Sequence, residues 1–198
     1  MNELLVYLIG YLAGSVNFSI LLFRVMKKDD PRTRFSGNAG VTNVYRQAGM
    51  GWAALVLALD MGRSAAVAFL AVCLLSAPAA VWAGLALVAG NRFPVFHGFR
   101  GGKGVANYLG FTAFLSPAAA AASCAVWVAV YAVVRVPFVA SFIMLAVLAA
   151  GTVMFFSSEP PAVAGSLCTV LCIMINHSRN IRDMLENRKK GAHEQQQD

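Results

Sequence analysis

The sequence predicts an all-α protein that crosses a membrane several times. Its 198 residues are 59% hydrophobic and only 13% charged, and its mean hydropathy is +0.65. The apolar residues form long blocks separated by short polar segments, a distribution typical of helices that span a bilayer. A net charge of +7 would favour a nucleic-acid partner in a soluble protein. In a membrane protein the positive-inside rule explains this charge, so we expect no nucleic-acid partner.

Seven apolar blocks follow one another along the chain. The first runs from Leu4 to about Val25, and it carries Glu3 where a signal peptide would be basic, so we expect it to be retained as a span. The others cover residues 52–75, 79–89, 104–115, 117–134, 138–156 and 162–175. Turn-forming residues separate several of them, at 76–78, 116–117 and 157–161.

The stretch 104–134 is either one kinked helix or two short helices that turn at Ser116 and Pro117. Charge decides between these readings. With two helices and the N-terminus outside, the basic segments 26–51, 91–103, 135–137 and 176–190 all lie inside, and the outer turns hold no Lys or Arg. With one helix, the basic tail would lie on the same side of the membrane as the N-terminus, which breaks the positive-inside rule. The sequence therefore predicts seven transmembrane helices in one domain, residues 1–190, with a cytoplasmic C-terminus and a disordered tail at 191–198.

A polar loop, residues 36–43, precedes Arg46 in the first inner segment. Its glycines allow successive backbone N–H groups to point at one anion. Short polar side chains add donors, and the Arg46 guanidinium suits a phosphate group. The candidate anion-binding residues here are Ser36, Gly37, Asn38, Gly40, Thr42, Asn43 and Arg46. The alternative interpretation is a flexible loop that supplies helix caps.

A second glycine-rich loop contains Gly101, Gly102 and Lys103 and leads into the block that starts at residue 104. A helix N-terminus beside a lysine is suited to phosphate. The loop is not a Walker A motif, because that motif requires Gly where His97 stands and Ser or Thr where Gly104 stands. The alternative interpretation is a surface anchor for lipid headgroups.

Two further features place polar groups on the cytoplasmic side or in the half of the membrane next to it. Asp60 and Arg63 lie inside the second block at helical spacing, where each charge costs roughly 2.5–3.5 kcal/mol to insert. They can pair for structural reasons alone, or serve function. His177 and Asn180 lie one turn apart after the last block, where a histidine is often simply interfacial. Together these features predict a protein that handles phosphorylated substrates.

Several other kinds of site are missing from the sequence. There is no His-x4-Asp acyltransferase signature and no Ser-His-Asp arrangement that spacing would support. No metal-ligand set is evident, and we interpret the four cysteines as small packing residues. We therefore expect neither a metal nor a cofactor.

The motifs together resemble the bacterial acyl-phosphate:glycerol-3-phosphate acyltransferase family. The segments that carry this resemblance are Gly14-Ser15, Asp30-Pro31-Arg32, residues 36–46, Phe93-Pro94-Val95-Phe96, residues 99–106 and His177-x-x-Asn180-Ile181. The resemblance implies seven spans with the N-terminus outside, in a bacterial inner membrane, and a site that faces the cytoplasm. It implies transfer of a fatty acyl group from acyl phosphate to the 1-hydroxyl of glycerol 3-phosphate, giving lysophosphatidic acid, in contact with membrane lipid. The resemblance also implies contact with the enzyme that makes acyl phosphate.

The resemblance also implies roles for individual residues. Phosphate binding falls to Ser36, Asn38, Arg46 and Lys103, with Arg63 supporting their charge and Asp60 holding Arg63. His177 and Asn180 position or polarise the acceptor, so the expected catalytic residues are Ser36, Lys103, His177 and Asn180. Ser141 is expected to face the site, and a substrate phosphate to act as the base.

The chain departs from the family pattern at a few positions. Phe35 and Asn91 replace a usual Gly and His, Arg63 replaces a usual Lys, and Phe138 replaces a usual Ser. These departures leave two alternatives: a catalytically altered or inactive paralogue, and a transporter of a phosphorylated metabolite.

Overall fold

The computed structural model describes residues 2–194, and it describes side chains as far as residue 186. All the regular structure in this part of the chain is helical. The α-helices are α1 (Glu3–Ser15), α2 (Phe18–Val25), α3 (Val41–Ala48), α4 (Met50–Leu74), α5 (Ala77–Arg92), α6 (Val105–Leu115), α7 (Pro117–Val134), α8 (Pro137–Phe155), α9 (Pro160–Ile175) and α10 (Ser178–Glu194). Two short 3₁₀ helices, η1 (Pro31–Thr33) and η2 (Val95–His97), lie in the loops.

Each predicted apolar block is helical, the first as the pair α1 and α2, whereas α3 and α10 lie outside the blocks. Five segments are long and apolar enough to cross a bilayer: Glu3–Val25, which joins α1 and α2, then Met50–Leu74, Ala77–His97, Pro117–Val134 and Pro137–Phe155. The pair α9 and α10, bent by 44°, adds a sixth if it is counted as one span. Helix α6 is apolar but shorter. Length and composition thus support five or six spans, and α6 is the helix on which a count of seven depends.

Residues 104–134 form two helices, as the charge argument predicted. Helix α6 ends at Leu115, and Ser116 caps the start of α7 by accepting a hydrogen bond from the Ala119 N–H at 3.3 Å. Pro117 occupies the first turn of α7, where its missing N–H costs nothing.

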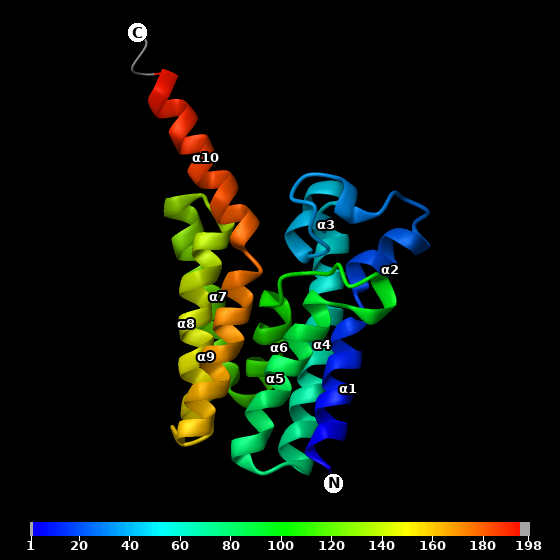
Figure 1. The fold of residues 1–198 in the computed structure, drawn as a ribbon, viewed down its shortest axis with the longest axis vertical. Coiled ribbons are helices and arrows are strands. Elements are labelled where there is room, and N and C mark those ends of the chain that lie inside the picture. The colour runs from blue at the N-terminus through cyan, green and yellow to red at the C-terminus, as the bar shows by residue number, and fades with distance from the viewer. Residues whose placement is uncertain (1, 195–198) are drawn as a thin grey trace.

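Close backbone contacts hold the first half of the bundle together. Helix α1 packs along α5, and α4 packs along α6 (Figure 1). A Cβ atom on Gly90 of α5 would collide with the Tyr11 carbonyl of α1, and one on Gly110 of α6 would lie 2.5 Å from the Met61 Cα of α4. Small residues are needed at such crossings because the driving force between helices in lipid is close packing.

The two ends of the bundle differ. Helix α1 begins at one end, and the loops around α2 and α3, together with α10, lie at the other (Figure 1). Helix α10 continues past Lys190 to Glu194, so part of the segment 191–198 that the sequence predicts as disordered is helical. Residues 195–198 lie outside the described residues.

Candidate active site

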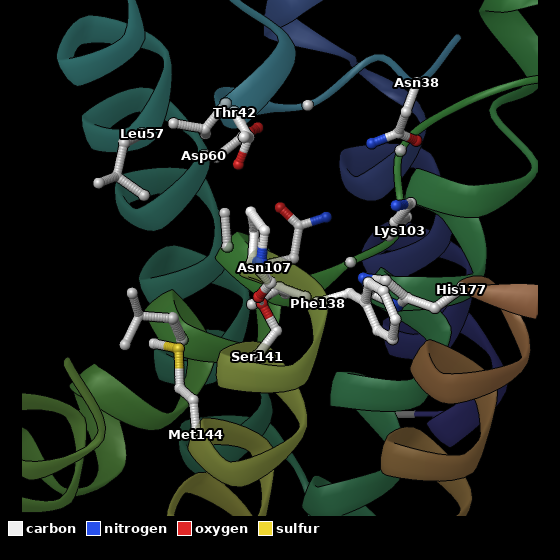
Figure 2. A pocket seen from close by; sticks show the side chains of 18 of the residues that line it. Asn38, Thr42, Leu57, Asp60, Lys103, Asn107, Phe138, Ser141, Met144 and His177 are labelled. Atoms are coloured by element: carbon white, nitrogen blue, oxygen red, sulfur yellow. Dashed lines mark hydrogen bonds between the residues drawn. The ribbon is translucent and has the colours of Figure 1, made fainter. Parts of the chain in front are cut away.

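A cavity of about 460 Å³ opens where the two polar loops meet the ends of α6, α8 and α9. One part of its wall is polar. The residues of this part are Asn38, Gly40, Thr42, Arg46, Asp60, Asn91, Gly102, Lys103, Asn107, Ser141, His177 and Asn180. The other part is mainly apolar, and includes Leu57, Val105, Leu109, Trp127, Val128, Phe138 and Met144. Figure 2 shows Asp60 on one side of this space and Lys103 and His177 on the other.

The first loop is shaped by Asn43, which is 1% exposed. Its Nδ2 donates hydrogen bonds to the carbonyl oxygens of Pro31 at 2.7 Å and Asn38 at 2.9 Å. These bonds curl the chain so that Asn38, Gly40 and Thr42 reach the cavity wall. Asn43 itself does not line the cavity, so the structure gives it a loop-building position instead of the anion-binding position predicted from its residue type.

The second loop is built around Asn91. Its backbone oxygen accepts a hydrogen bond from the Gly102 N–H at 2.9 Å. A Cβ on Gly102 would lie 2.7 Å from Asn91 Nδ2 and 2.9 Å from the Ala39 oxygen, so the two glycine-rich loops touch at a point that admits no side chain. A Cβ on Gly101 would likewise collide with the Asn91 backbone oxygen. The glycines are therefore required for close packing between the two loops.

Arg32 ties the same two loops together from outside the cavity. Its Nη1 donates to the carbonyl oxygens of His97 at 2.9 Å and Arg100 at 2.6 Å. Its Nη2 lies 2.6 Å from the Asp30 carboxylate. The hydrogen bonds that Arg32 donates to this carboxylate hold the pKa of Asp30 below its usual value. Asp30 and Arg32 thus position the loops and do not contact the cavity.

Lys103 extends from the second loop toward the start of α10. Its Nζ donates to Asn180 Oδ1 at 2.7 Å, and its backbone oxygen accepts from Asn176 Nδ2 at 3.1 Å. Arg92 Nε in turn donates to Asn176 Oδ1 at 3.0 Å. Burial, followed by repulsion from Arg46, lowers the pKa of Lys103 to about 8. The ammonium group is therefore mainly charged at neutral pH, and it loses its proton as the pH rises through about 8.

His177 stands between α9 and α10 and is 3% exposed. Its Nδ1 lies 2.8 Å from the Ile173 carbonyl oxygen. Burial, followed by the charge of Lys103, lowers the pKa of His177 to about 4, so the ring is neutral at pH 7. In that form Nδ1–H donates to Ile173, and Nε2 remains an acceptor for a ligand in the cavity.

Asp60 and Arg63 form a buried ion pair at 2.9 Å, with 11% and 9% of their side chains exposed. Asp60 lines the cavity, whereas Arg63 lies behind it. Arg63 donates to Asn107 Oδ1 at 2.6 Å and to the Val16 carbonyl oxygen, and it lies over the ring of Phe18. The predicted pairing of these two charges is confirmed.

Most of the predicted site residues meet in this one cavity, but a few do not. Those outside its wall are Ser36, Gly37, Asn43, Arg63 and Gly101. Ser141 does line it, yet its hydroxyl already donates to the Pro137 oxygen at 3.0 Å and accepts from Trp127 Nε1 at 3.2 Å. Asn107 and Trp127 were missed by the sequence prediction. Asn107 could have been noticed as a polar residue inside an apolar block.

A family model described as glycerol-3-phosphate acyltransferase matches residues 4–187. This chain belongs to the glycerol-3-phosphate acyltransferase family. Relatives in this family include the proteins named glycerol-3-phosphate acyltransferase of Anaeromyxobacter dehalogenans strain 2CP-C, 39% identical over 91% of this chain and 92% of the relative, and of Jannaschia sp. strain CCS1, 41% identical over 88% and 85%.

Two solved structures of a family member share this fold. They are crystal structures of PlsY, described as an integral membrane glycerol 3-phosphate acyltransferase, in a glycerol 3-phosphate form and a lysophosphatidic acid form. The first has a TM-score of 0.85 and 31% identity, and the second 0.81 and 30%; each comparison covers 94% of this chain and 93% of the other. With the apolar helices described above, this likeness makes the chain a multi-pass membrane protein.

The departures from the family pattern fall at distinct places. Phe35 is exposed, at a φ of +53° that disfavours a bulky side chain. Asn91 is buried in the cavity wall, and His97 is turned away from it, with Nε2 3.4 Å from the Asn17 N–H. Phe138 forms part of the apolar wall. Among the described residues, no group of three His, Cys, Asp or Glu side chains is placed to hold a metal ion.

Proposed function

We propose that this protein transfers a fatty acyl group from acyl phosphate to the 1-hydroxyl of glycerol 3-phosphate, giving lysophosphatidic acid and phosphate. Family membership supports the acyltransferase activity and its acceptor, since the related PlsY structures hold glycerol 3-phosphate and lysophosphatidic acid. The observation that carries the proposal is the division of one cavity into an apolar part and a polar part. The polar part contains Arg46 and Lys103 and is called the cationic part below.

The cationic part suits two phosphorylated substrates. Arg46 and Lys103 supply positive charge from α3 and from the second loop. Asn38 and Thr42 add polar side chains beside them. Two phosphate groups repel one another, so a site that binds both needs fixed positive groups that are oriented before the substrates arrive. The bond from Lys103 to Asn180 provides such an orientation.

The apolar part suits the acyl chain. Leu57 of α4, Leu109 of α6 and Met144 of α8 contribute to its walls. Cys124 and Val128 of α7 line the same cavity and are also exposed on the outer surface of the helices. The cavity therefore reaches the flank of the protein, where a chain longer than the cavity continues into the lipid.

The reaction needs little beyond correct placement of its two substrates. Bringing a hydroxyl to an activated acyl carbon supplies roughly 7–11 kcal/mol of the barrier reduction in well-oriented systems. Lys103 and Arg46 stabilise the negative charge that develops on the carbonyl oxygen and the departing phosphate. His177 Nε2 accepts a hydrogen bond from a hydroxyl of the acceptor and so orients it. Acyl phosphate, as a mixed anhydride, brings its own leaving group.

The test compares donors with purified protein in lipid nanodiscs. Palmitoyl phosphate, palmitoyl-CoA and palmitoyl carrier protein are each supplied with radiolabelled glycerol 3-phosphate, and labelled lysophosphatidic acid is counted. We expect product from palmitoyl phosphate alone, with matching phosphate release. Lys103→Ala should abolish it, whereas Arg135→Ala, which removes an exposed cation outside the cavity, should not. No product from folded protein would favour an inactive paralogue, and product from palmitoyl-CoA would contradict the donor.

We propose further that the chain spans a bacterial plasma membrane seven times, with its N-terminus outside and the cavity facing the cytoplasm. Helix α1 begins at one end of the bundle and α10, the last helix, lies at the other (Figure 1), which supports an odd number of spans. The test uses a cysteine-free variant in intact cells. Cysteine introduced at Ser158 should react with an impermeant maleimide, whereas cysteine at Arg100 should react only after lysis. The reverse result would overturn this orientation.

Contact with the enzyme that makes acyl phosphate would take place on the cytoplasmic side.

A further inference from the structure

Three successive hydrogen bonds hold the loop that carries Lys103. Gly101 and Gly102 donate their N–H groups to backbone oxygens at the end of α5, at 3.2 and 2.9 Å. The third bond comes from a side chain, because Asn176 Nδ2 donates to the Lys103 backbone oxygen at 3.1 Å. The first two bonds tie the loop to α5, and the third ties it to the end of α9.

Asn176 stands at the junction that also carries His177 and Asn180. It is the C-terminal cap of α9, and its N–H donates to the Cys172 backbone oxygen at 3.0 Å. The chain bends by 44° here before it continues as α10. His177 follows in the bend, and Asn180 lies in the first turn of α10. The bond from Asn176 to the Lys103 backbone oxygen therefore joins two parts of the cavity wall that come from distant segments of the chain.

Arg92, at the end of α5, sets the direction of the Asn176 amide. Its Nε donates to Asn176 Oδ1 at 3.0 Å, and its guanidinium lies over the ring of Phe93, with Cζ 5.0 Å from the ring centroid. An arginine side chain has donors and no acceptor, so the amide oxygen must face Arg92 and the amide nitrogen must face the Lys103 carbonyl. Rotating the amide by 180° would place two oxygen atoms together at one end and two nitrogen donors together at the other.

Neither Arg92 nor Asn176 lines the cavity, so neither contacts the substrates. Their effect on the reaction passes through Lys103, whose Nζ is in turn bonded to Asn180 Oδ1 at 2.7 Å. The lysine is thus held at both ends from the same junction, by Asn176 at its backbone and by Asn180 at its ammonium group. Small displacements matter in such a site, since a shift of about 1 Å caused by a distant substitution can cost about 100-fold in rate.

We infer that Asn176 is a positioning residue of the active site, and that Arg92 acts through it by fixing the direction of its amide. This inference rests on the proposed function. Asn176 keeps the Lys103 loop at a constant distance from the α9–α10 junction. A phosphate group bound by Lys103 and a hydroxyl oriented by His177 therefore meet in one geometry. Arg92 contributes its Nε–H donor, and its charge is not required for this role.

Two substitutions of Arg92 separate its donor from its charge. The amide nitrogen of glutamine occupies the same place along the side chain as arginine Nε, so Arg92→Gln keeps a donor for Asn176 Oδ1 without the charge. Arg92→Met keeps the apolar stem and has no donor. Asn176→Leu keeps the size of the side chain and removes both of its bonds. Arg100→Met is the matched control, because Arg100 is an exposed arginine near the same loop and its side chain makes no hydrogen bond among the described residues.

The experiment measures lysophosphatidic acid formed in nanodiscs, with glycerol 3-phosphate titrated at fixed palmitoyl phosphate. We expect Asn176→Leu to lower kcat about 10- to 100-fold and to raise the KM for glycerol 3-phosphate about 3- to 10-fold. Arg92→Met should lower kcat/KM about 5- to 20-fold, whereas Arg92→Gln and Arg100→Met should stay within about threefold of the wild type. The double variant with Arg92→Met and Asn176→Leu should be no worse than Asn176→Leu alone, because Arg92 acts through Asn176.

The pH dependence gives a readout that a smaller amount of folded protein would not change. Burial of Lys103 lowers its pKa to about 8, so in the wild type the KM for glycerol 3-phosphate should rise near that pH. Release of the loop in Asn176→Leu gives the ammonium group more contact with water. Its pKa then moves up, and the KM should begin to rise at a higher pH than in the wild type. The other ionisable groups around Lys103 all remain in this variant: Arg46, Asp60, Arg92, Cys124, His177 and Asp183.

Each outcome bears on a different statement. Asn176→Leu with kcat and KM within threefold of the wild type overturns the inference. Equal losses in Arg92→Gln and Arg92→Met, or losses that multiply in the double variant, overturn the role of Arg92 as a donor that acts through Asn176. Should Asn176→Leu fail to fold, the two Arg92 variants still decide, since activity of Arg92→Met equal to that of Arg92→Gln overturns the inference. A wild type that makes no lysophosphatidic acid from any donor overturns the proposed function itself, and the inference with it.

Discussion

Removing the Arg32 side chain should weaken substrate binding without slowing the chemical step. Arg32 is outside the cavity but donates to the carbonyl oxygens of His97 and Arg100 in the second loop. A hydrogen bond from a charged group is worth roughly 1.5–3 kcal/mol. One quarter of the side chain is exposed, so solvent screening reduces this value, and we take about 2 kcal/mol for the pair of bonds.

A loss of this size has a defined effect on affinity. It lowers the population in which the two loops lie together, and the apparent KM rises as that population falls. About 2 kcal/mol corresponds to about 30-fold, so Arg32→Ala should raise the KM for glycerol 3-phosphate about 10- to 30-fold. At saturating substrate the loops are held together by the ligand, so kcat should stay within about twofold.

The assay is a steady-state titration of glycerol 3-phosphate at fixed palmitoyl phosphate. Arg34→Ala is the matched control, since Arg34 lies in the same loop and pairs with Asp29 in an exposed ion pair. Such pairs contribute about 0–1 kcal/mol, so this control should resemble the wild type. A KM for Arg32→Ala within threefold of the wild type, or an equal loss in both variants, would refute the idea that Arg32 holds the loops.

Three further predictions concern pH, packing and loop structure. The pKa of Lys103 is lowered to about 8, so its charge is present below that pH and lost above it. The KM for glycerol 3-phosphate, measured across this range, should therefore rise as pH passes 8. Lys103→Arg should abolish the rise, since Arg stays charged. Gly90→Ala drives a Cβ into the Tyr11 carbonyl and should cost about 1–3 kcal/mol in thermal unfolding, whereas Gly62→Ala, with open space around it, should be neutral or stabilising. Asn43→Ala removes the side-chain donor that joins the carbonyl oxygens of Pro31 and Asn38, so it should cost about 1–3 kcal/mol and raise the KM for glycerol 3-phosphate; unfolding and titration together measure these effects.

The helices were predictable because hydropathy marks them directly. Every apolar block is helical, the first as the pair α1 and α2, and the turn signal at Ser116 and Pro117 together with charge separated α6 from α7. Helix α3 was not predicted. It covers only Val41–Ala48, which is too short for periodicity to stand out, and most of its residues are polar. Its importance is positional, because it brings Thr42 and Arg46 to the cavity wall.

Residue type predicted which loops form the site better than it predicted which residues face it. Asn38 and Asn43 are the same amino acid five positions apart, yet one lines the cavity and the other is buried under the loop. The difference depends on carbonyl groups such as that of Pro31, whose position is set by tertiary structure. Asp60 was recognised because charge is rare inside a span, whereas Asn107, a neutral residue, gave a weaker signal.

The buried polar group behind the cavity shows how a departure from the family pattern is accommodated. Arg63 stands where the family resemblance predicts a lysine, and its guanidinium reaches Asp60, Asn107 and the Val16 carbonyl oxygen at once. A lysine is a compact charge on a flexible stem and lacks the planar fork that serves such separated acceptors. The Asn107 amide oxygen accepts from Arg63 Nη2 at 2.6 Å and from Ser64 Oγ at 3.4 Å, so the guanidinium provides the shorter of its two hydrogen bonds. What this arrangement preserves is the position of the Asp60 carboxylate in the cavity wall, with Oδ1 held by Arg63.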